Sequence, residues 1–424
     1  MSFTITEKIL LAHIEKKSVH PGEFINARVD LALGNDITAP IAIKKFKAMA
    51  SKKVFNRKKV VLVADHFVPN KDAQSAKQTK ILKDFSREFK ITNHYTLGNG
   101  GIEHVLLPQQ GLILPGSLVI GADSHTCTYG ALGAFSTGVG STDLAATWIT
   151  GRVWLRVPET IKFVYTGRPR AWVGGKDFIL HTIGDIGVSG ALYKAMEFSG
   201  PTIRRLPMDD RFSMCNMAIE AGGKSGIVEP DEITRKYLAS VFNGPSSLVR
   251  KKTFKSDKGA VYSAVKEYDV SRIEPQVACP HLPSNVKPAG NLKKINIDQA
   301  VIGSCTNGRM SDLKMAAKVL KNRRVSSRVR LLIFPGTQLI YRQALRSGLI
   351  GEFIKAGGVV CPPTCGPCLG GHMGILGENE VAIATTNRNF RGRMGALSSK
   401  VYLSNPAVAA ASAVKGRIAH PEEL

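Results

Sequence analysis

The sequence predicts an α/β fold built from parallel and mixed sheets, with a candidate active site at the carboxyl ends of the strands. Three observations predict it. Short apolar segments bounded by polar residues have the length and composition of buried parallel strands. Several of these segments lead directly into reactive side chains, at the edge where open α/β sheets bind ligands. The chain has 424 residues, which is too long for one hydrophobic core and predicts two or three domains.

Three of the predicted strands are followed at once by residues that can carry chemistry. The strands are residues 60–64, 117–121 and 299–303. The side chains that follow them are, in turn, Asp65-His66, Asp123-Ser124-His125 and Cys305-Thr306-Asn307. Because the carboxyl ends of parallel strands lie at one edge of a sheet, we expect these side chains to lie near a common site.

The remaining elements extend this pattern into the C-terminal part of the chain. After Cys305, Ser311 is a candidate N-cap for a helix that begins at about Asp312. Residues 381–384 form a further predicted strand, followed by a polar segment with several arginines. Domain changes are expected near residues 158 and 288, the second in a connector at 280–290 that contains Pro and Asn. This divides the chain into residues 1–158, 159–287 and 288–424.

The net charge of +25 allows three interpretations, which are nucleic-acid binding, an acidic partner or anionic substrates. Lysine and arginine are spread along the whole chain, and aromatic residues make up only 7%. Basic triplets occur at residues 57–59 and 250–252, but there is no dense basic tail. These features argue against nucleic-acid binding as the main function.

Membrane and secretory classes have little support in the sequence. No apolar run approaches the ~20 residues that span a bilayer. The N-terminal segment has acidic residues early and lacks the apolar block of a signal peptide. A cytoplasmic location is therefore expected.

Seven cysteines are the first chemical signal: Cys127, Cys215, Cys279, Cys305, Cys361, Cys365 and Cys368. Their odd number in a large chain argues against a disulfide scaffold and favours metal or catalytic roles. Cys365-Gly366-Pro367-Cys368 is a C-x-x-C motif, and nearby glycines would let backbone amides approach inorganic sulfide. An iron-sulfur cluster, a zinc site, a redox pair and buried inert thiols are all open on the pattern alone.

A zinc site and a redox pair each predict a particular spacing or position of the cysteines. Zinc could be held by Cys361, Cys365, Cys368 and His372, although their spacing is compressed compared with paired knuckles. A redox C-x-x-C of thioredoxin type is expected at a helix start after an early strand. Here the motif lies late in the chain and in a loop rich in Gly and Pro.

Histidine–carboxylate groups and an arginine pair are the second signal. The candidates for acid–base chemistry are Asp65, His66, His104, Asp123, His125 and Glu220. A carboxylate beside an imidazole holds one tautomer and stabilises the charged form. Arg388 and Arg393 flank a turn after a strand, and arginine binds carboxylates in a bidentate manner. The intervening Arg391 is expected to be solvated.

Seven ordered segments together resemble the aconitase superfamily along nearly the full length of the chain. They are residues 64–66 (ADH), 99–104 (NGGIEH), 121–126 (GADSHT), 216–220 (NMAIE), 303–307 (GSCTN), 365–368 (CGPC) and 387–393 (NRNFRGR). Within the superfamily, the chain most resembles the large subunits of 3-isopropylmalate dehydratases and homoaconitases. The resemblance implies a three-domain aconitase-like fold that lacks the swivelling fourth domain of single-chain aconitases.

The resemblance also implies a cofactor and a role for each candidate residue. One 4Fe-4S cluster would be held by Cys305, Cys365 and Cys368, leaving one iron open as a Lewis acid. His66 would be the acid that protonates the leaving hydroxyl, oriented by Asp65, while Asp123 pairs with His104 and His125 with Glu220. Polar groups near substrate or cluster would be Ser124, Asn216, Asn307, Asn387, Arg388 and Arg393.

The missing fourth domain implies a partner and leaves the substrate open. The resemblance places the serine base on a separate small subunit that carries the swivelling domain, in a heterodimer or heterotetramer. The implied reaction isomerises 2-isopropylmalate to 3-isopropylmalate in leucine biosynthesis, by dehydration and rehydration. Homocitrate and 2,3-dimethylmalate are alternative substrates. An RNA-binding aconitase relative and a non-catalytic scaffold subunit are alternatives of a different class.

Overall fold

The computed structural model describes residues 2–245, 247 and 253–424 of the chain. The basic triplet at 250–252 lies outside the described residues. The elements form an α/β protein with parallel and mixed sheets, as the sequence predicts. No helix among the described residues is long and apolar enough to cross a membrane.

The N-terminal part is a five-stranded parallel sheet in the order β4-β3-β2-β5-β6. Its strands are β2 (Leu31–Asn35), β3 (Val60–Val63), β4 (Asn93–Tyr95), β5 (Leu118–Gly121) and β6 (Phe135–Gly138). Its helices are α1 (Ile5–Leu11), α2 (Ala39–Ala48), α3 (Ala73–Glu88), α4 (Glu103–Gln109) and α5 (Ser141–Thr150). A separate antiparallel ribbon joins β1 (Phe24–Arg28) to β7 (Arg152–Arg156).

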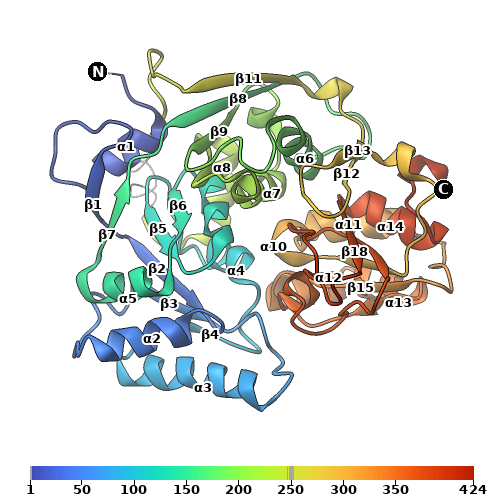
Figure 1. Ribbon diagram of the computed structural model, residues 1–424, viewed down its shortest axis with the longest axis horizontal. Helices are drawn as coiled ribbons and strands as arrows, with labels where there is room; N and C mark the ends of the chain where they lie inside the picture. Colours follow the sequence, from blue (N-terminus) through green and yellow to red (C-terminus); the bar gives the residue numbers. More distant parts are fainter. Residues whose placement is uncertain (1, 246, 248–252) are drawn as a thin grey trace.

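Both faces of this sheet are buried, which explains why its strands are apolar throughout. Val60 and Leu62 pack in one hydrophobic core with Trp148 of α5, whereas Val61 and Val63 face a second core. Parallel strands covered on both faces lose the alternation of polar and apolar residues seen in half-exposed strands. The helices α2 and α3 cover the first face, in the lower part of Figure 1.

The middle part is a four-stranded parallel sheet in the order β10-β9-β8-β11. Its strands are β8 (Thr160–Thr166), β9 (Ala195–Ser199), β10 (Ser225–Val228) and β11 (Ala264–Asp269). Its helices are α6 (Gly175–Ile186), α7 (Met208–Asn216) and α8 (Glu232–Val241).

The C-terminal part is a seven-stranded mixed sheet in the order β13-β12-β18-β17-β14-β15-β16. Its strands are β12 (Gln276–Ala278), β13 (Val286–Pro288), β14 (Gln299–Ile302), β15 (Arg330–Ile333), β16 (Val359–Val360), β17 (Val381–Ala384) and β18 (Lys400–Ser404). Its helices are α10 (Ser304–Asn307), α11 (Met310–Leu320), α12 (Gln338–Arg346), α13 (Leu349–Lys355) and α14 (Pro406–Lys415). In Figure 1 this part lies at the right, and α10 faces α4 and α7 near the centre of the molecule.

The strand pairing corrects the expected connector at residues 280–290. Strands β12 and β13 pair antiparallel with each other, and β12 also pairs with β18. Residues 280–290, expected to be a connector, therefore include a strand of the C-terminal sheet, because backbone pairing with a distant strand is not visible in local composition. We propose domain divisions near residues 158 and 270.

A second correction concerns the start of α11. Ser311 lies inside this helix and donates its hydroxyl to Asp209 at 2.6 Å, so it is not the N-cap. The helix begins earlier because the carboxylate of Asp312 accepts the backbone N–H of Arg309 at 2.9 Å. A carboxylate in the first turn is also favoured by the helix dipole.

Candidate active site

One cavity, of about 260 Å³, collects most of the predicted site residues from the first and third sheets. The predicted residues that line it are Asp65, His66, His104, Asp123, His125, Cys305, Cys365, Cys368, Asn387, Arg388 and Arg393. Residues that directly follow β3, β5 and β14 meet here, together with residues that follow β17 by a few positions. The cavity is therefore the meeting point of strand carboxyl ends that are far apart in sequence.

The turn after β14 shows why the local sequence presents Cys305 to this cavity. Gly303 has a φ of +144°, and a Cβ there would lie 2.3 Å from the carbonyl oxygen of Phe334. Only glycine fits such a close approach of two backbone segments. The chain then enters the short helix α10, whose second residue is Cys305.

The three thiols are free, and side-chain amides contact two of them. Cys305 and Cys368 are buried, and all seven cysteines are free. The Nδ2 groups of Asn216 and Asn387 donate to Cys305 Sγ at 3.2 and 3.3 Å. Donors aimed at sulfur stabilise a thiolate, which is the form that binds metal. Asn387 Oδ1 also accepts from Cys368 Sγ at 3.4 Å.

The three thiols and the lining of the cavity do not match a single zinc site. Ligands of one tetrahedral zinc lie roughly 4 Å apart. Among the described residues, the groups whose ligand atoms all lie within 4.8 Å of one another do not include Cys305, Cys365 and Cys368 as a set. The alternative zinc ligands Cys361 and His372 do not line the cavity. Soft thiolates are the ligands that an iron-sulfur cluster requires.

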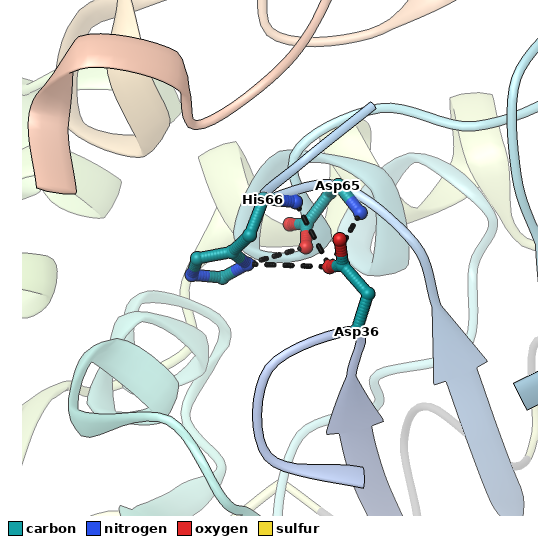
Figure 2. Close-up of side chains that lie close together, drawn as sticks. All are labelled: Asp36, Asp65 and His66. Atoms are coloured by element: carbon teal, nitrogen blue, oxygen red, sulfur yellow. Dashed lines mark hydrogen bonds and ion pairs between the residues drawn. The ribbon is translucent and has the colours of Figure 1, made fainter. Parts of the chain in front are cut away.

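His66 directs its Nδ1 toward two buried carboxylates, those of Asp65 and Asp36, as Figure 2 shows. Its Nδ1 lies 2.7 Å from Asp65 Oδ1 and 3.8 Å from Asp36 Oδ1. Burial opposes the charged imidazolium, but the charges of Asp65 and Asp36 outweigh it and hold the pKa of His66 well above its usual range. With Nδ1 engaged by Asp65, the proton on Nε2 is the one available to the cavity.

Asp36 was not a sequence-predicted site residue, although it organises this turn. Its carboxylate accepts the backbone N–H groups of Asp65 at 3.1 Å, His66 at 2.9 Å and Phe67 at 2.8 Å. These three bonds, of which Figure 2 shows those to Asp65 and His66, fix the backbone from which the His66 side chain projects. Its position directly after the apolar strand β2 is the sequence signal that could have identified it.

A second network joins the other two predicted histidine–carboxylate pairs. His104 Nε2 lies 2.9 Å from Asp123 Oδ1, and His125 Nε2 lies 2.8 Å from Glu220 Oε1. Burial raises the pKa of Asp123, but hydrogen bonds from both histidines overcome this and hold it well below its usual range. Arg388 Nε donates to Glu220 Oε1 at 2.8 Å, which orients the guanidinium at the cavity wall.

Four predicted residues do not line this cavity. Asn216 donates a hydrogen bond to Cys305, which lines the cavity. Glu220 is hydrogen-bonded to two other lining residues, His125 and Arg388. Asn307 is buried, and its Nδ2 donates to Asp312 Oδ1 at 2.9 Å. Ser124 lines a neighbouring cavity with Thr137, Gly138 and Lys224, and Asp123 lines both cavities.

Two basic side chains near the cysteines, Arg393 and Lys176, have buried nitrogen atoms. The Nε of Arg393 is buried and has no hydrogen-bond partner among the described residues, which suits an anionic ligand in the cavity. Lys176 of α6, absent from the sequence prediction, donates Nζ to the carbonyl oxygens of Thr385 and Thr386 at 3.0 and 2.5 Å. Burial lowers the pKa of Lys176 to about 8. These bonds tie the middle sheet's helix to the segment that carries Asn387.

The chain is similar to known proteins over its full length. The aconitase family (aconitate hydratase) matches residues 7–294 and 285–416. The 3-isopropylmalate dehydratase large subunit of Thermodesulfovibrio yellowstonii is 62% identical over 424 residues, covering 100% of both chains. The protein of the same name from Syntrophus aciditrophicus is 61% identical, also covering 100% of both chains.

A solved structure shows the same fold at low sequence identity. The holo-form of aconitase X from Thermococcus kodakaraensis matches with a TM-score of 0.50 and 12% identity, covering 90% of this chain and 88% of that chain. The aconitase-like fold predicted from the sequence is thereby confirmed. Since the family matches most of the chain, and relatives about three-fifths identical span all of it, the chain belongs to the aconitase family.

Proposed function

We propose that the chain is the large subunit of a 3-isopropylmalate dehydratase, a hydro-lyase that interconverts 2-isopropylmalate and 3-isopropylmalate. The observation that carries the proposal is the cavity in which three free thiols, the His66–Asp65 pair and two arginines meet. The names of the relatives that are 62% and 61% identical support this choice of substrate over homocitrate and 2,3-dimethylmalate.

The chain's thiols fit a cluster with one open site. We propose that Cys305, Cys365 and Cys368 hold a 4Fe-4S cluster, which when bound supplies a Lewis-acid iron for the substrate hydroxyl. The amide donors on Cys305 Sγ support this assignment, and so does the Nε of Arg393, for which no described residue is a hydrogen-bond partner. A thiolate set of three, rather than four, suits a cluster that binds substrate rather than one that only transfers electrons.

His66 has the protonation and the position of a general acid. The carboxylates of Asp65 and Asp36 keep the imidazole protonated, and its Nε2 lies 3.7 Å from Asp123 Oδ2. In the dehydration half-reaction, the C–O bond of the substrate breaks and the Nε2 proton passes to the departing oxygen, which leaves as water. Rehydration at the neighbouring carbon reverses these transfers.

Two arginines of the cavity are candidates for binding the substrate. Arg388 is oriented by Glu220, and Arg393, which is half-buried with a fully buried Nε, lines the same cavity. We propose that they bind the two carboxylates of the substrate, which fixes the reacting carbons relative to His66. An anionic substrate also accounts for part of the net charge of +25, because a positive site attracts anions.

We propose that the base that removes the proton from the substrate carbon does not belong to this chain. The relatives are named large subunits, which supports a second, small subunit that brings this base. We expect the purified, cluster-loaded chain to be inactive alone and active with a small subunit. Full activity of the chain alone would contradict the two-subunit proposal, and the same assay with homocitrate and 2,3-dimethylmalate tests the substrate.

The pH dependence of the reaction tests the pairing of His66 with Asp65. Replacing Asp65 by Asn removes a negative charge that stabilises the imidazolium, so the pKa of His66 falls. Because the acid must be protonated, activity is lost as pH rises through this pKa. The alkaline limb of kcat/KM is therefore expected to move by roughly one to three pH units to lower pH in D65N. An unchanged alkaline limb would show that another group is the acid.

A further inference from the structure

Glu103 is a buried carboxyl group in the wall of the cavity that the mechanism above does not use. It is the first residue of α4 and is only 1% exposed. Its Oε1 accepts a hydrogen bond from Asn35 Nδ2 at 3.1 Å. Its Oε2 is buried and has no hydrogen-bond partner among the described residues. An unpartnered buried oxygen is costly unless a ligand or a proton satisfies it.

The orientation of Asn35 shows which oxygen of Glu103 can carry a proton. Asn35 Oδ1 accepts from the backbone N–H groups of Ile37 and Thr38 at 3.1 and 3.0 Å, and from the Thr38 hydroxyl at 2.9 Å. The amide therefore cannot be reversed, and its Nδ2 must be the donor to Glu103. Since Oε1 is occupied as an acceptor, a proton on Glu103 belongs on Oε2.

The surroundings of Glu103 favour the neutral carboxylic acid. Asp65 Oδ2 accepts its backbone N–H at 2.7 Å, and Asp123 belongs to the same cluster of potential ligand groups. His66, the nearest imidazolium, already pairs with Asp65. Burial, followed by the charges of Asp65 and Asp123, raises the pKa of Glu103 well above its usual range.

His104 does not supply a compensating positive charge. Its Nε2 lies 2.9 Å from Asp123 Oδ1 but 3.4 Å from Glu103 Oε1, so its proton is directed to Asp123. Its Nδ1 lies 3.1 Å from the hydroxyl of Tyr129, which can donate to it. Burial lowers the pKa of His104 despite the bond to Asp123, so the ring is neutral.

We propose that Glu103 is protonated on Oε2 and donates this hydrogen to an oxygen of the bound 2-hydroxy dicarboxylic acid. This inference rests on the proposed function, because it assigns a contact to the same substrate. Glu103 would thus be a substrate-binding residue that adds a neutral donor beside the charged arginines. A carboxylate at this position would instead repel the anionic substrate.

Two substitutions distinguish a neutral donor from a carboxylate or a structural residue. In E103Q, the amide keeps a neutral donor at this position, and we expect kcat/KM within about threefold of the wild type. In E103L, the donor is lost, and we expect kcat/KM to fall about 10- to 100-fold, as for a lost hydrogen bond to a charged group. E103Q impaired as strongly as E103L would show that an ionised carboxylate is needed, and E103L with wild-type kinetics would show that Glu103 does not bind the substrate. Either result would overturn the proposal.

The controls separate binding from folding and from the proposed function. Melting temperature and iron content should match the wild type in both variants. E197Q is a matched control, since Glu197 is also buried with a raised pKa but lies in β9 outside the cavity. We expect its kinetics to be unchanged.

An infrared difference spectrum tests the protonation without any substrate. The wild-type chain minus E103Q should show a carboxylic-acid C=O band at neutral pH. A carboxylate band instead would overturn the inference even if the dehydratase activity is confirmed. The acid band would remain if the substrate assignment were wrong, so the two proposals fail separately.

Discussion

Replacing Cys365 by serine is expected to abolish retention of the iron-sulfur cluster and, with it, the activity of the two-subunit enzyme. Cys365 lines the cavity together with Cys305 and Cys368, and its backbone N–H donates to Asp65 O at 2.8 Å. A serine hydroxyl keeps the size of the side chain but does not supply the soft thiolate that iron-sulfur clusters require. Iron and sulfide analysis under anaerobic conditions, with a visible absorbance spectrum, measures the effect directly.

The matched control for this variant is C361S, four residues earlier in the chain. Cys361 is buried and its backbone N–H pairs with Ile333 O at 2.8 Å, but its side chain does not line the cavity. We therefore expect about four irons per chain in the wild type and in C361S, and loss of the cluster in C365S. Unchanged iron content in C365S, or zinc in the wild-type chain, would overturn the ligand assignment.

Replacing His66 by alanine is expected to leave the cluster intact and to lower turnover by roughly 10²–10⁴-fold, as for a lost general acid. The thiols do not depend on the imidazole, because the contacts of Cys305 come from Asn216 and Asn387. The turn itself is held by the carboxylate of Asp36 through backbone N–H groups that remain in the variant. In H66A, steady-state kinetics should therefore show the lowered turnover, while the visible spectrum of the cluster should match the wild type.

The control for this substitution is H181A, on α6. His181 packs against Tyr268 and lies outside the cavity, so its replacement should not change kcat. If H66A keeps wild-type turnover, His66 is not the acid and the D65N experiment loses its basis. If H66A loses the cluster, His66 acts instead through the stability of the site.

The strands that lead into the site residues could be predicted because each one is a short apolar segment of the sequence. Each predicted strand at 60–64, 117–121, 299–303 and 381–384 corresponds to an observed strand within one residue at each end. Buried parallel strands need continuous apolar residues, and this pattern is visible in a short window. The helix start at Ser311 was wrong because a side chain that can cap a helix does so only where the backbone allows it.

The chemistry of single residues could be assigned from sequence, but their surroundings could not. The C-x-x-C motif and the Asp65-His66 pair were recognisable as adjacent residues. Asp36 and Glu103 were missed as site residues, because their roles arise from burial and from neighbours that are distant in the chain. Asp36 is 29 residues from Asp65, and Asn35 is 68 residues from Glu103.

The sequence alone determined the α/β class, the order of the strands that end in reactive residues and the family to which the chain belongs. These properties depend on residue types at short spacing, which the unfolded chain already contains. Only the tertiary structure decided that β12 and β13 join the C-terminal sheet and that Ser124 lines a neighbouring cavity. It also decided that Oε2 of Glu103 has no hydrogen-bond partner in the part of the chain that the structure describes. Such facts depend on backbone pairing, burial and the sum of nearby charges, which exist only once distant segments have packed together.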